Sequence, residues 1–404
     1  MKLSRLALPV LFAALAAPAL AQKEVVVWHA YRAEEKEALE KVVASYNATV
    51  ASKGIKVTTL AVPYDAFADK ITAAVPRGKG PDVFIYAQDR LGGWIEAGKT
   101  VEPIDFFLDK ATKDRFIPTT MEAMTYRGTV YGLPLNYEVI TLIYNRKLVP
   151  TPPKTSKELV ATAKKLTDAK SGRFGLAYSY SDFYYHAALQ NAFGGRVFDP
   201  GPKPVLNAPE NVKALELLMR WFTVDGILPA EPSTALITSL FNGGKAAMVF
   251  SGPWFLGEIA KSIDYGLAPL PTIDEAGGKP MRPWMTVEGV YVTAPSQSKD
   301  AAYDFAKYLT DTPQAKVMAV EGRQTPANKA VYSDPAVSGD KVLSAFRKQV
   351  EVAVPMPNLP EMTMVWSPAT TAMNTIVKKS ATPKAAMDQA QKAIERDVAA
   401  LRKK

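Results

Sequence analysis

The chain has 404 residues, of which 48% are hydrophobic and 22% are charged. These proportions are typical of a globular protein, and the length predicts two or three domains. The sequence contains no cysteine, which excludes disulfides, thiolate metal sites and a lipid-modified cysteine. Because His29 and His186 are the only histidines, a multi-histidine metal site is also excluded, and we expect no cofactor.

Residues 1–21 have the pattern of a secretory signal peptide. Lys2 and Arg5 precede an apolar run, and Ala19-Leu20-Ala21 forms a small-x-small cleavage site. The apolar run is shorter than the ~20 residues that a membrane-spanning helix needs. We therefore expect a mature chain that begins at Gln22 and lies in the periplasm without a lipid anchor.

The formal net charge of +9 is concentrated near the C-terminus, where residues 378–404 hold eight basic and three acidic side chains. A helical pattern begins near Pro383, so these charges fit a solvated helix face. Aromatic residues that could stack on bases are not interleaved with them. We expect no nucleic-acid partner.

Strand and helix patterns alternate over the first hundred residues of the mature chain. Buried-strand runs at 25–28, 55–60 and 83–86 are separated by helical apolar spacing at 39–50 and 67–75. This order predicts a parallel sheet covered by helices. Ligands bind beyond the carboxyl ends of such strands, which here means the residues that follow the first and third strands, 29–32 and 88–90.

A second alternating region follows and predicts a second lobe. Its expected elements are strands at 140–144, 174–178 and 247–250 and helices at 155–169, 183–193 and 212–222. A strand at 287–292 then returns to the first region, and a helix from Lys299 covers it. The pattern predicts two α/β lobes joined by more than one crossing.

The sequence lacks the phosphate loop, the dinucleotide-binding glycine motif, the His-Glu-x-x-His zinc motif and the Gly-x-Ser-x-Gly nucleophile motif. Aromatic residues instead stand beside polar ones at predicted strand ends, such as Tyr86 beside Asp89 and Arg90. Flat rings complement the C–H face of a pyranose, and charged groups bind its hydroxyls. The combination favours a sugar-binding cleft.

Five separated segments resemble bacterial maltose/maltodextrin-binding proteins, the extracytoplasmic receptors of ATP-driven sugar importers. The first runs from Gly80 to Gly93 and contains Asp89-Arg90-Leu91-Gly92-Gly93. The others follow in the same order over the whole mature chain. They are 131–145, 241–248, Ser251-Gly252-Pro253-Trp254, and Met356-Pro357-Asn358-Leu359-Pro360 with Trp366.

The resemblance implies the two-lobed type II periplasmic-binding-protein fold, in which each lobe is a sheet flanked by helices and hinge crossings join the lobes. The expected limits are 22–136 with 290–322 for the N-terminal lobe and 137–284 with 325–404 for the C-terminal lobe. The implied function is capture of an α-glucoside between the lobes and delivery to an ABC transporter permease by a monomeric, non-enzymatic receptor.

The resemblance also implies the ligand contacts. Matched positions are Asp89, Arg90 and Glu138 as polar contacts and Tyr184, Trp254 and Trp366 as stacking aromatics. Tyr86 and Asp182 replace a tryptophan and a glutamate of the family. Departures from the family pattern lie at Tyr31, Arg32, Trp284 and Glu288, with Thr370 in place of an arginine, so the sugar can be maltose, trehalose, sucrose or a maltodextrin.

Three questions stay open at this stage. A secreted glycoside hydrolase would use two of Asp89, Glu138 and Asp182, with the carboxyl groups about 5–9.5 Å apart. A receptor of the same fold for a peptide or a polyamine would favour a strongly charged cleft. His29 and His186 fall near the cleft, where we expect neutral, hydrogen-bonding imidazoles.

Overall fold

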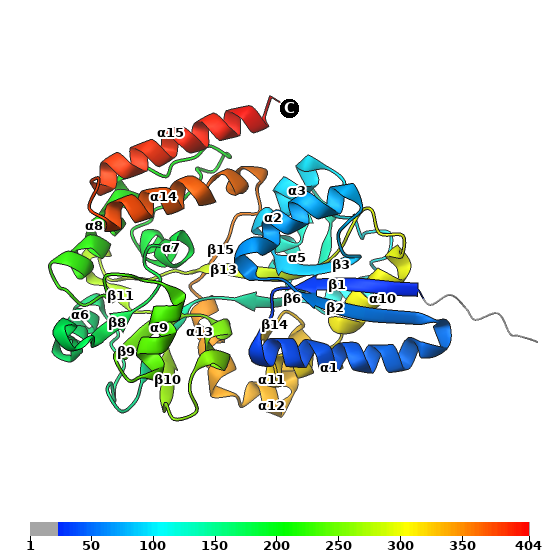
Figure 1. Cartoon of the computed structure of the whole chain (residues 1–404), viewed down its shortest axis with the longest axis horizontal. Coiled ribbons are helices and arrows are strands. Elements are labelled where there is room, and N and C mark those ends of the chain that lie inside the picture. The colour runs from blue at the N-terminus through cyan, green and yellow to red at the C-terminus, as the bar shows by residue number, and fades with distance from the viewer. Residues whose placement is uncertain (1–22, 404) are drawn as a thin grey trace, which may run out of the picture.

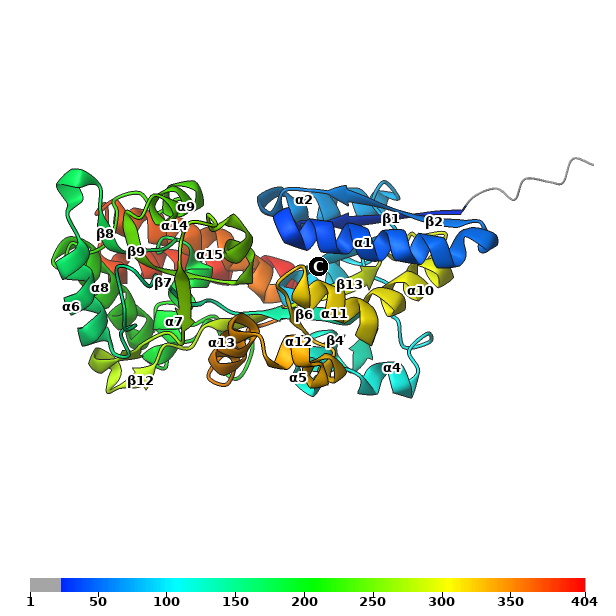
Figure 2. The same cartoon turned by 90° about the horizontal axis from the view of Figure 1, so that it is seen from below.

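The computed structural model describes residues 23–403 and contains two α/β lobes that lie side by side (Figure 1). The expected signal peptide therefore lies outside the described residues. The predicted two-lobed fold class is confirmed. Strands β6 and β13 run between the lobes, and the view from below shows the same arrangement (Figure 2).

The first lobe is built on a seven-stranded sheet with the order β14-β6-β13-β3-β1-β2, and β15 pairs with β13. The strands are β1 (Lys23–His29), β2 (Ile55–Ala61), β3 (Val83–Ala87), β6 (Gly132–Glu138), β13 (Trp284–Val292), β14 (Thr325–Pro326) and β15 (Val354–Pro355). β1 is parallel to β2 and β3, as predicted. β13 runs antiparallel to both β3 and β6, so the full sheet is mixed.

Helices cover this sheet because their apolar residues recur at helical spacing. In α1 the residues Leu39, Val42, Val43 and Tyr46 form one buried face. The helices of this part of the chain are α1 (Ala33–Val50), α2 (Tyr64–Ala74), α3 (Leu91–Ala97), α4 (Lys110–Asp114), α5 (Pro118–Ala123), α10 (Lys299–Leu309) and α11 (Thr312–Val320). A small hairpin joins β4 (Thr125–Tyr126) to β5 (Thr129–Val130).

The second lobe contains a four-stranded sheet in the order β10-β7-β9-β8. Its strands are β7 (Thr141–Asn145), β8 (Phe174–Ala177), β9 (Ala246–Ser251) and β10 (Tyr265–Ala268), with a hairpin of β11 (Thr272–Ile273) and β12 (Lys279–Pro280) beside it. Its helices are α6 (Ser156–Leu166), α7 (Phe183–Ala192), α8 (Pro209–Thr223), α9 (Thr234–Asn242), α13 (Lys341–Val350), α14 (Trp366–Val377) and α15 (Pro383–Leu401). The start of α6 is fixed because the Thr155 hydroxyl accepts from the Glu158 amide at 3.2 Å.

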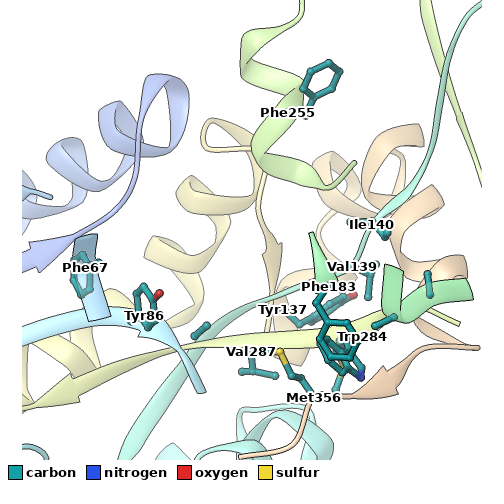
Figure 3. Packing of buried hydrophobic residues seen from close by; sticks show 14 of the residues in the cluster. Phe67, Tyr86, Tyr137, Val139, Ile140, Phe183, Phe255, Trp284, Val287 and Met356 are labelled. Atoms are coloured by element: carbon teal, nitrogen blue, oxygen red, sulfur yellow. The ribbon is translucent and has the colours of Figure 1, made fainter. Parts of the chain in front are cut away.

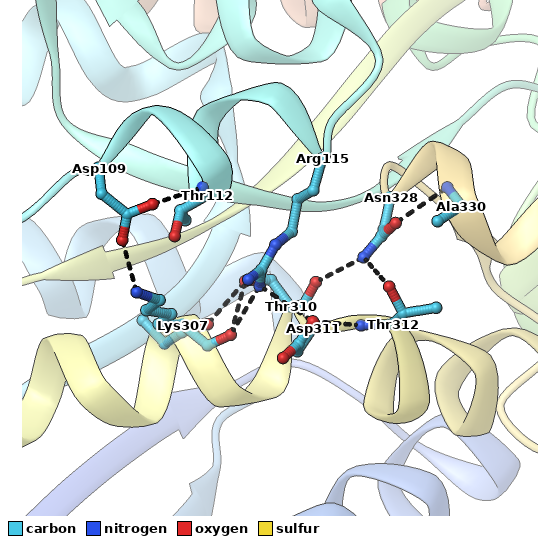
Figure 4. Close-up of polar contacts among 10 residues, drawn as sticks. Asp109, Thr112, Arg115, Lys307, Thr310, Asp311, Thr312, Asn328 and Ala330 are labelled. Carbon is cyan, nitrogen blue, oxygen red and sulfur yellow. Dashed lines mark hydrogen bonds and ion pairs between the residues drawn. The ribbon is translucent and has the colours of Figure 1, made fainter.

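The segment that follows α11 belongs to the larger sheet by its pairing. We expected residues from 325 onward in the second lobe, but β14 pairs with β6, and α12 (Pro335–Ser338) lies near α11. Figure 4 shows how Asn328 holds this segment: its Nδ2 donates to the Thr310 carbonyl at 3.1 Å, and its Oδ1 accepts from the Ala330 amide at 3.0 Å. By this pairing the third crossing comes later than residue 325, and the lobe limits otherwise remain predictions.

Two of the segments that carry the family resemblance meet in space. Gly92 at the start of α3 donates its amide to the Asn358 carbonyl at 3.2 Å, and a Cβ at Gly92 would lie 2.4 Å from that oxygen. Only glycine allows this approach of two backbones. The contact fixes the turn after β3 against the 3₁₀ helix η8 (Pro360–Met364), which leads directly to Trp366.

Candidate functional site

The candidate site lies where the strands of the larger sheet end. Because β1, β2 and β3 are parallel, their carboxyl ends meet at one edge. Tyr31 and Arg32 follow β1, Tyr64 follows β2, and Asp89 with Arg90 follows β3 in the 3₁₀ helix η3 (Gln88–Arg90). The antiparallel neighbours β6 and β13 add Glu138 and Glu288 at the same edge, since Glu288 pairs with Ala87.

Two carboxylates share one face of the sheet at this edge. Glu288 is opposite Asn136 and Thr286 is opposite Glu138, so Glu138 and Glu288 are diagonal neighbours on adjacent strands. The Tyr31 hydroxyl donates to Glu288 Oε2 at 2.6 Å. Burial raises the pKa of Glu138 well above its usual range, and the neighbouring Glu288 and Glu35 charges raise it further. Burial likewise raises the pKa of Glu288, while the hydrogen bond from Tyr31 opposes this shift.

Asp89 joins the first lobe to the start of α14. Its Oδ2 accepts from the Trp366 indole Nε1 at 2.9 Å and lies 3.1 Å from Arg90 Nε. The Arg90 guanidinium carbon is 5.9 Å from the centre of the Trp366 ring, which places a cation over an aromatic face. Burial raises the pKa of Asp89 to about 6, although the Arg90 charge and the indole N–H both oppose the shift.

Trp366 also belongs to an aromatic cluster formed by the second lobe and the adjoining end of β13. The ring centroids of Tyr184 and Trp254 are 6.1 Å apart, and those of Trp284 and Trp366 are 5.8 Å apart in an edge-to-face pair. Tyr184 also approaches Trp284 at 6.3 Å, so one set of contacts links all four rings. Its hydroxyl accepts from Thr286 Oγ1 at 3.2 Å. These contacts fix the orientations of the rings relative to one another.

The turn before Trp254 explains why glycine precedes it. Trp254 lies in the 3₁₀ helix η5 (Pro253–Glu258), which follows β9 directly. A Cβ at Gly252 would lie 2.3 Å from the Trp254 ring. The missing side chain leaves the space in which this indole lies. The Gly-Pro-Trp sequence therefore sets the direction of the ring.

Burial separates the expected ligand contacts into two groups. Tyr86 and Trp284 are 4% and 3% exposed, and Trp284 packs edge to face on Phe183 (Figure 3). Tyr31, Asp89 and Glu288 are also buried. The remaining predicted contacts are partly or fully accessible: Arg32, Arg90, Glu138, Asp182, Tyr184, Trp254 and Trp366.

Arg32 forms an ion pair with a residue of the second lobe. Its Nε is 3.1 Å from Glu258 Oε1 at the end of η5. Beside this ion pair, a Cβ at Gly257 would lie 2.0 Å from the Glu34 carboxylate, so the start of α1 fits closely against η5. Arg32 therefore joins the two lobes directly in this structure.

Asp182 lies at the N-cap of α7, where its Oδ1 accepts from the Tyr184 amide at 2.8 Å. Desolvation by the surrounding protein raises the pKa of this carboxyl, the Tyr184 amide opposes the shift, and the nearby Asp65 charge adds to it. The side chain is nevertheless exposed to solvent. Asp65 belongs to α2 of the first lobe, so its charge acts on a carboxyl at the start of α7 in the second lobe.

Both histidines are buried, and burial lowers their pKa values. The pKa of His29 falls to about 4 and that of His186 to about 3, so both imidazoles are neutral near pH 7. His29 Nδ1 accepts from the Tyr31 amide at 3.1 Å and so helps to orient the turn after β1. Within the described residues, His186 has no hydrogen-bond partner.

Sequence reasoning missed three residues of this region: Glu35, Tyr64 and Glu258. Glu35 lies within α1, and burial followed by the Glu288 charge raises its pKa to about 8. Tyr64 follows the predicted second strand. The rule that ligands bind beyond the carboxyl ends of parallel strands, which located Arg32 and Asp89, would therefore also have found Tyr64. No sequence signal indicates that Glu258 meets Arg32, because this contact depends on how the lobes pack.

Among residues 23–403 there is no group of three or more His, Asp or Glu residues placed to hold a metal ion. Within the same range, no helix is both long and apolar enough to cross a bilayer.

Comparison with known proteins defines the class of this protein. Residues 31–316 match the family described as bacterial extracellular solute-binding protein, and the chain belongs to that family. A maltotriose-binding protein of Pyrococcus abyssi is 33% identical over 362 residues, covering 88% of this chain and 78% of the relative. A galactooligosaccharide-binding protein of Bacillus subtilis is 29% identical, covering 91% of this chain and 87% of the relative.

A solved structure supports the same assignment. The maltotriose-binding protein of Thermus thermophilus with bound maltotriose superposes with a TM-score of 0.84 at 28% identity. The match covers 93% of this chain and 100% of the other chain. The resemblance noted in the sequence is therefore confirmed at the level of both the family and the fold.

Proposed function

We propose that this protein is an extracytoplasmic receptor that binds a maltooligosaccharide between its two lobes. The observation that carries the proposal is a connected set of rings that includes the accessible Tyr184, Trp254 and Trp366. The last of these, Trp366, contacts the Asp89–Arg90 pair. Rings bind the apolar face of a pyranose, and the charged pair binds its hydroxyls. Relatives named for binding maltotriose support glucose-based oligosaccharides as the ligand class.

A binding role also fits the state of the carboxyl groups that a hydrolase would need. Asp89 is held by Trp366 and Arg90, and Asp182 caps α7. Glu138 and Glu288 are diagonal neighbours on adjacent strands of one sheet, so they lie on the same side of the site and do not flank a bond to be cleaved. We therefore propose a receptor without hydrolytic activity.

The same proposal includes export and delivery. We infer that residues 1–21 direct secretion into the periplasm and that the receptor, as a monomer, hands its sugar to the permease of an ABC transporter. Contacts between the lobes, such as Arg32 with Glu258, support a closed state in which sugar held by both lobes favours closure.

Isothermal titration calorimetry with a sugar panel tests the ligand class. The panel contains maltose, maltotriose, maltotetraose, trehalose, sucrose and a galactooligosaccharide. We expect the tightest binding for a maltooligosaccharide. Tightest binding of the galactooligosaccharide would overturn the assignment, and glucose released during incubation with maltotriose would support the hydrolase instead.

A further inference from the structure

An exposed tyrosine lies at the candidate site without any role assigned so far. Tyr64 is the first residue of α2 and follows the carboxyl end of β2, at the same sheet edge as Arg32 and Asp89. Its side chain is 53% exposed, although its ring stacks on Tyr86 with centroids 5.1 Å apart and planes 26° apart. Large aromatic side chains are usually more buried than this. An exposed ring at the edge of the sheet where ligands bind is therefore a candidate ligand contact.

The neighbouring rings determine which aromatic face is free. Phe67 also stacks on Tyr86, with centroids 4.9 Å apart and planes 6° apart, and Figure 3 shows these two rings side by side. Tyr86 is only 4% exposed because Phe67, Tyr64 and Trp94 pack around it. Tyr86 therefore supports the stack from within, and Tyr64 is its exposed member.

A charge at the start of α2 also acts on the second lobe. Asp65, the residue after Tyr64, is near enough for its charge to raise the pKa of Asp182, after the larger effect of desolvation. Asp182 immediately precedes α7, the helix that carries Tyr184. Tyr64 therefore belongs to the first lobe, while Tyr184 and Trp254 belong to the second.

We propose that Tyr64 is a sugar-stacking residue that gives the first lobe its own aromatic platform for a pyranose ring. The inference rests on the proposed function, because it assigns one further contact for the same maltooligosaccharide. The buried Tyr86 and Phe67 hold the Tyr64 ring in place, so its orientation is set before the sugar binds. Such preorganisation reduces the entropy that binding must overcome.

Calorimetry with maltotriose tests this on the full mature chain. Tyr64→Ala should weaken binding by about fivefold to tenfold, the effect expected from losing one aromatic contact. Tyr64→Phe keeps the ring and should bind within about threefold of wild type. Phe106→Ala is the matched control, because Phe106 is an exposed aromatic residue, 94% accessible, that pairs with Phe107 outside the site.

Thermal unfolding of each variant separates binding from folding. Because Tyr64 is half exposed, we expect Tyr64→Ala to melt close to wild type. If wild type binds maltotriose and Tyr64→Ala binds equally well, the stacking role is overturned and the receptor function stands. An equal loss in Tyr64→Ala and Tyr64→Phe would also overturn it, since the hydroxyl and not the ring would then carry the contact. If wild type does not bind maltotriose, both proposals fail.

Discussion

Replacing Trp284 by alanine distinguishes a supporting ring from a ligand contact. Trp284 is 3% exposed and packs edge to face on Phe183 at 5.4 Å and on Trp366 at 5.8 Å. Truncation of a buried tryptophan typically costs about 3–5 kcal/mol, because the neighbouring rings only partly fill the cavity. At about 2–4 °C for each kcal/mol in a unit of 150–250 residues, the unfolding midpoint should fall by roughly 6–20 °C.

The assay is thermal and urea unfolding followed by circular dichroism, with maltotriose calorimetry in parallel. Trp254→Ala is the comparison, because Trp254 is partly accessible and lies in the turn after β9. That variant should keep a midpoint near that of wild type but bind more weakly by on the order of 2 kcal/mol, the scale for losing an aromatic anchor. A Trp284→Ala variant that melts like wild type and only loses affinity would refute the reasoning.

Two further predictions concern charged groups of the site. Arg32 and Glu258 form an ion pair at 3.1 Å, but the Arg32 side chain is 54% exposed, so the pair should contribute only about 0.2–1 kcal/mol to closure of the lobes. Arg32→Ala should therefore weaken maltotriose binding by no more than about fivefold. Calorimetry at low and high salt checks this, and a loss above about twentyfold would mean that Arg32 contacts the sugar itself. Burial raises the pKa of Asp89 from 3.8 to about 6, so the folded protein binds the proton of this carboxyl more tightly than the unfolded chain does. The free energy of unfolding should therefore fall as the pH rises from about 4 to about 6. The unfolding free energy of Asp89→Asn, measured relative to wild type, should therefore increase between pH 4 and pH 7. The exposed Asp69→Asn control should show no such increase. A difference between Asp89→Asn and wild type that stays constant with pH would contradict the raised pKa of Asp89.

Much of the fold was predictable from short-range patterns. The runs at Val25 and Val83 are apolar on both faces, which is typical of strands covered by helices on two sides, and β1 and β3 form there. The buried spacing of α1 was equally clear. These signals depend on neighbours in the sequence, so they do not require knowledge of the packed molecule.

What the sequence did not reveal depends on long-range pairing. β14 has two residues, Thr325 and Pro326, and joins the sheet only because β6 offers an edge. Trp366 is the first residue of α14, and its indole reaches Asp89, 277 positions earlier in the chain. Whether a ring is accessible or covered likewise depends on residues from distant segments, so Tyr86 and Trp284 could not be separated from Trp254 by sequence alone.

A crystal structure of the protein with maltotriose tests the central claim most directly. We expect the sugar between the lobes, with rings on Trp254 and Trp366, hydroxyls on Asp89 or Arg90, and Tyr64 against a pyranose face. Contacts from both lobes are required, because a ligand favours closure only through its different affinity for the two states. A structure at saturating maltotriose in which the cleft is empty, or in which the sugar touches one lobe alone, would contradict the account.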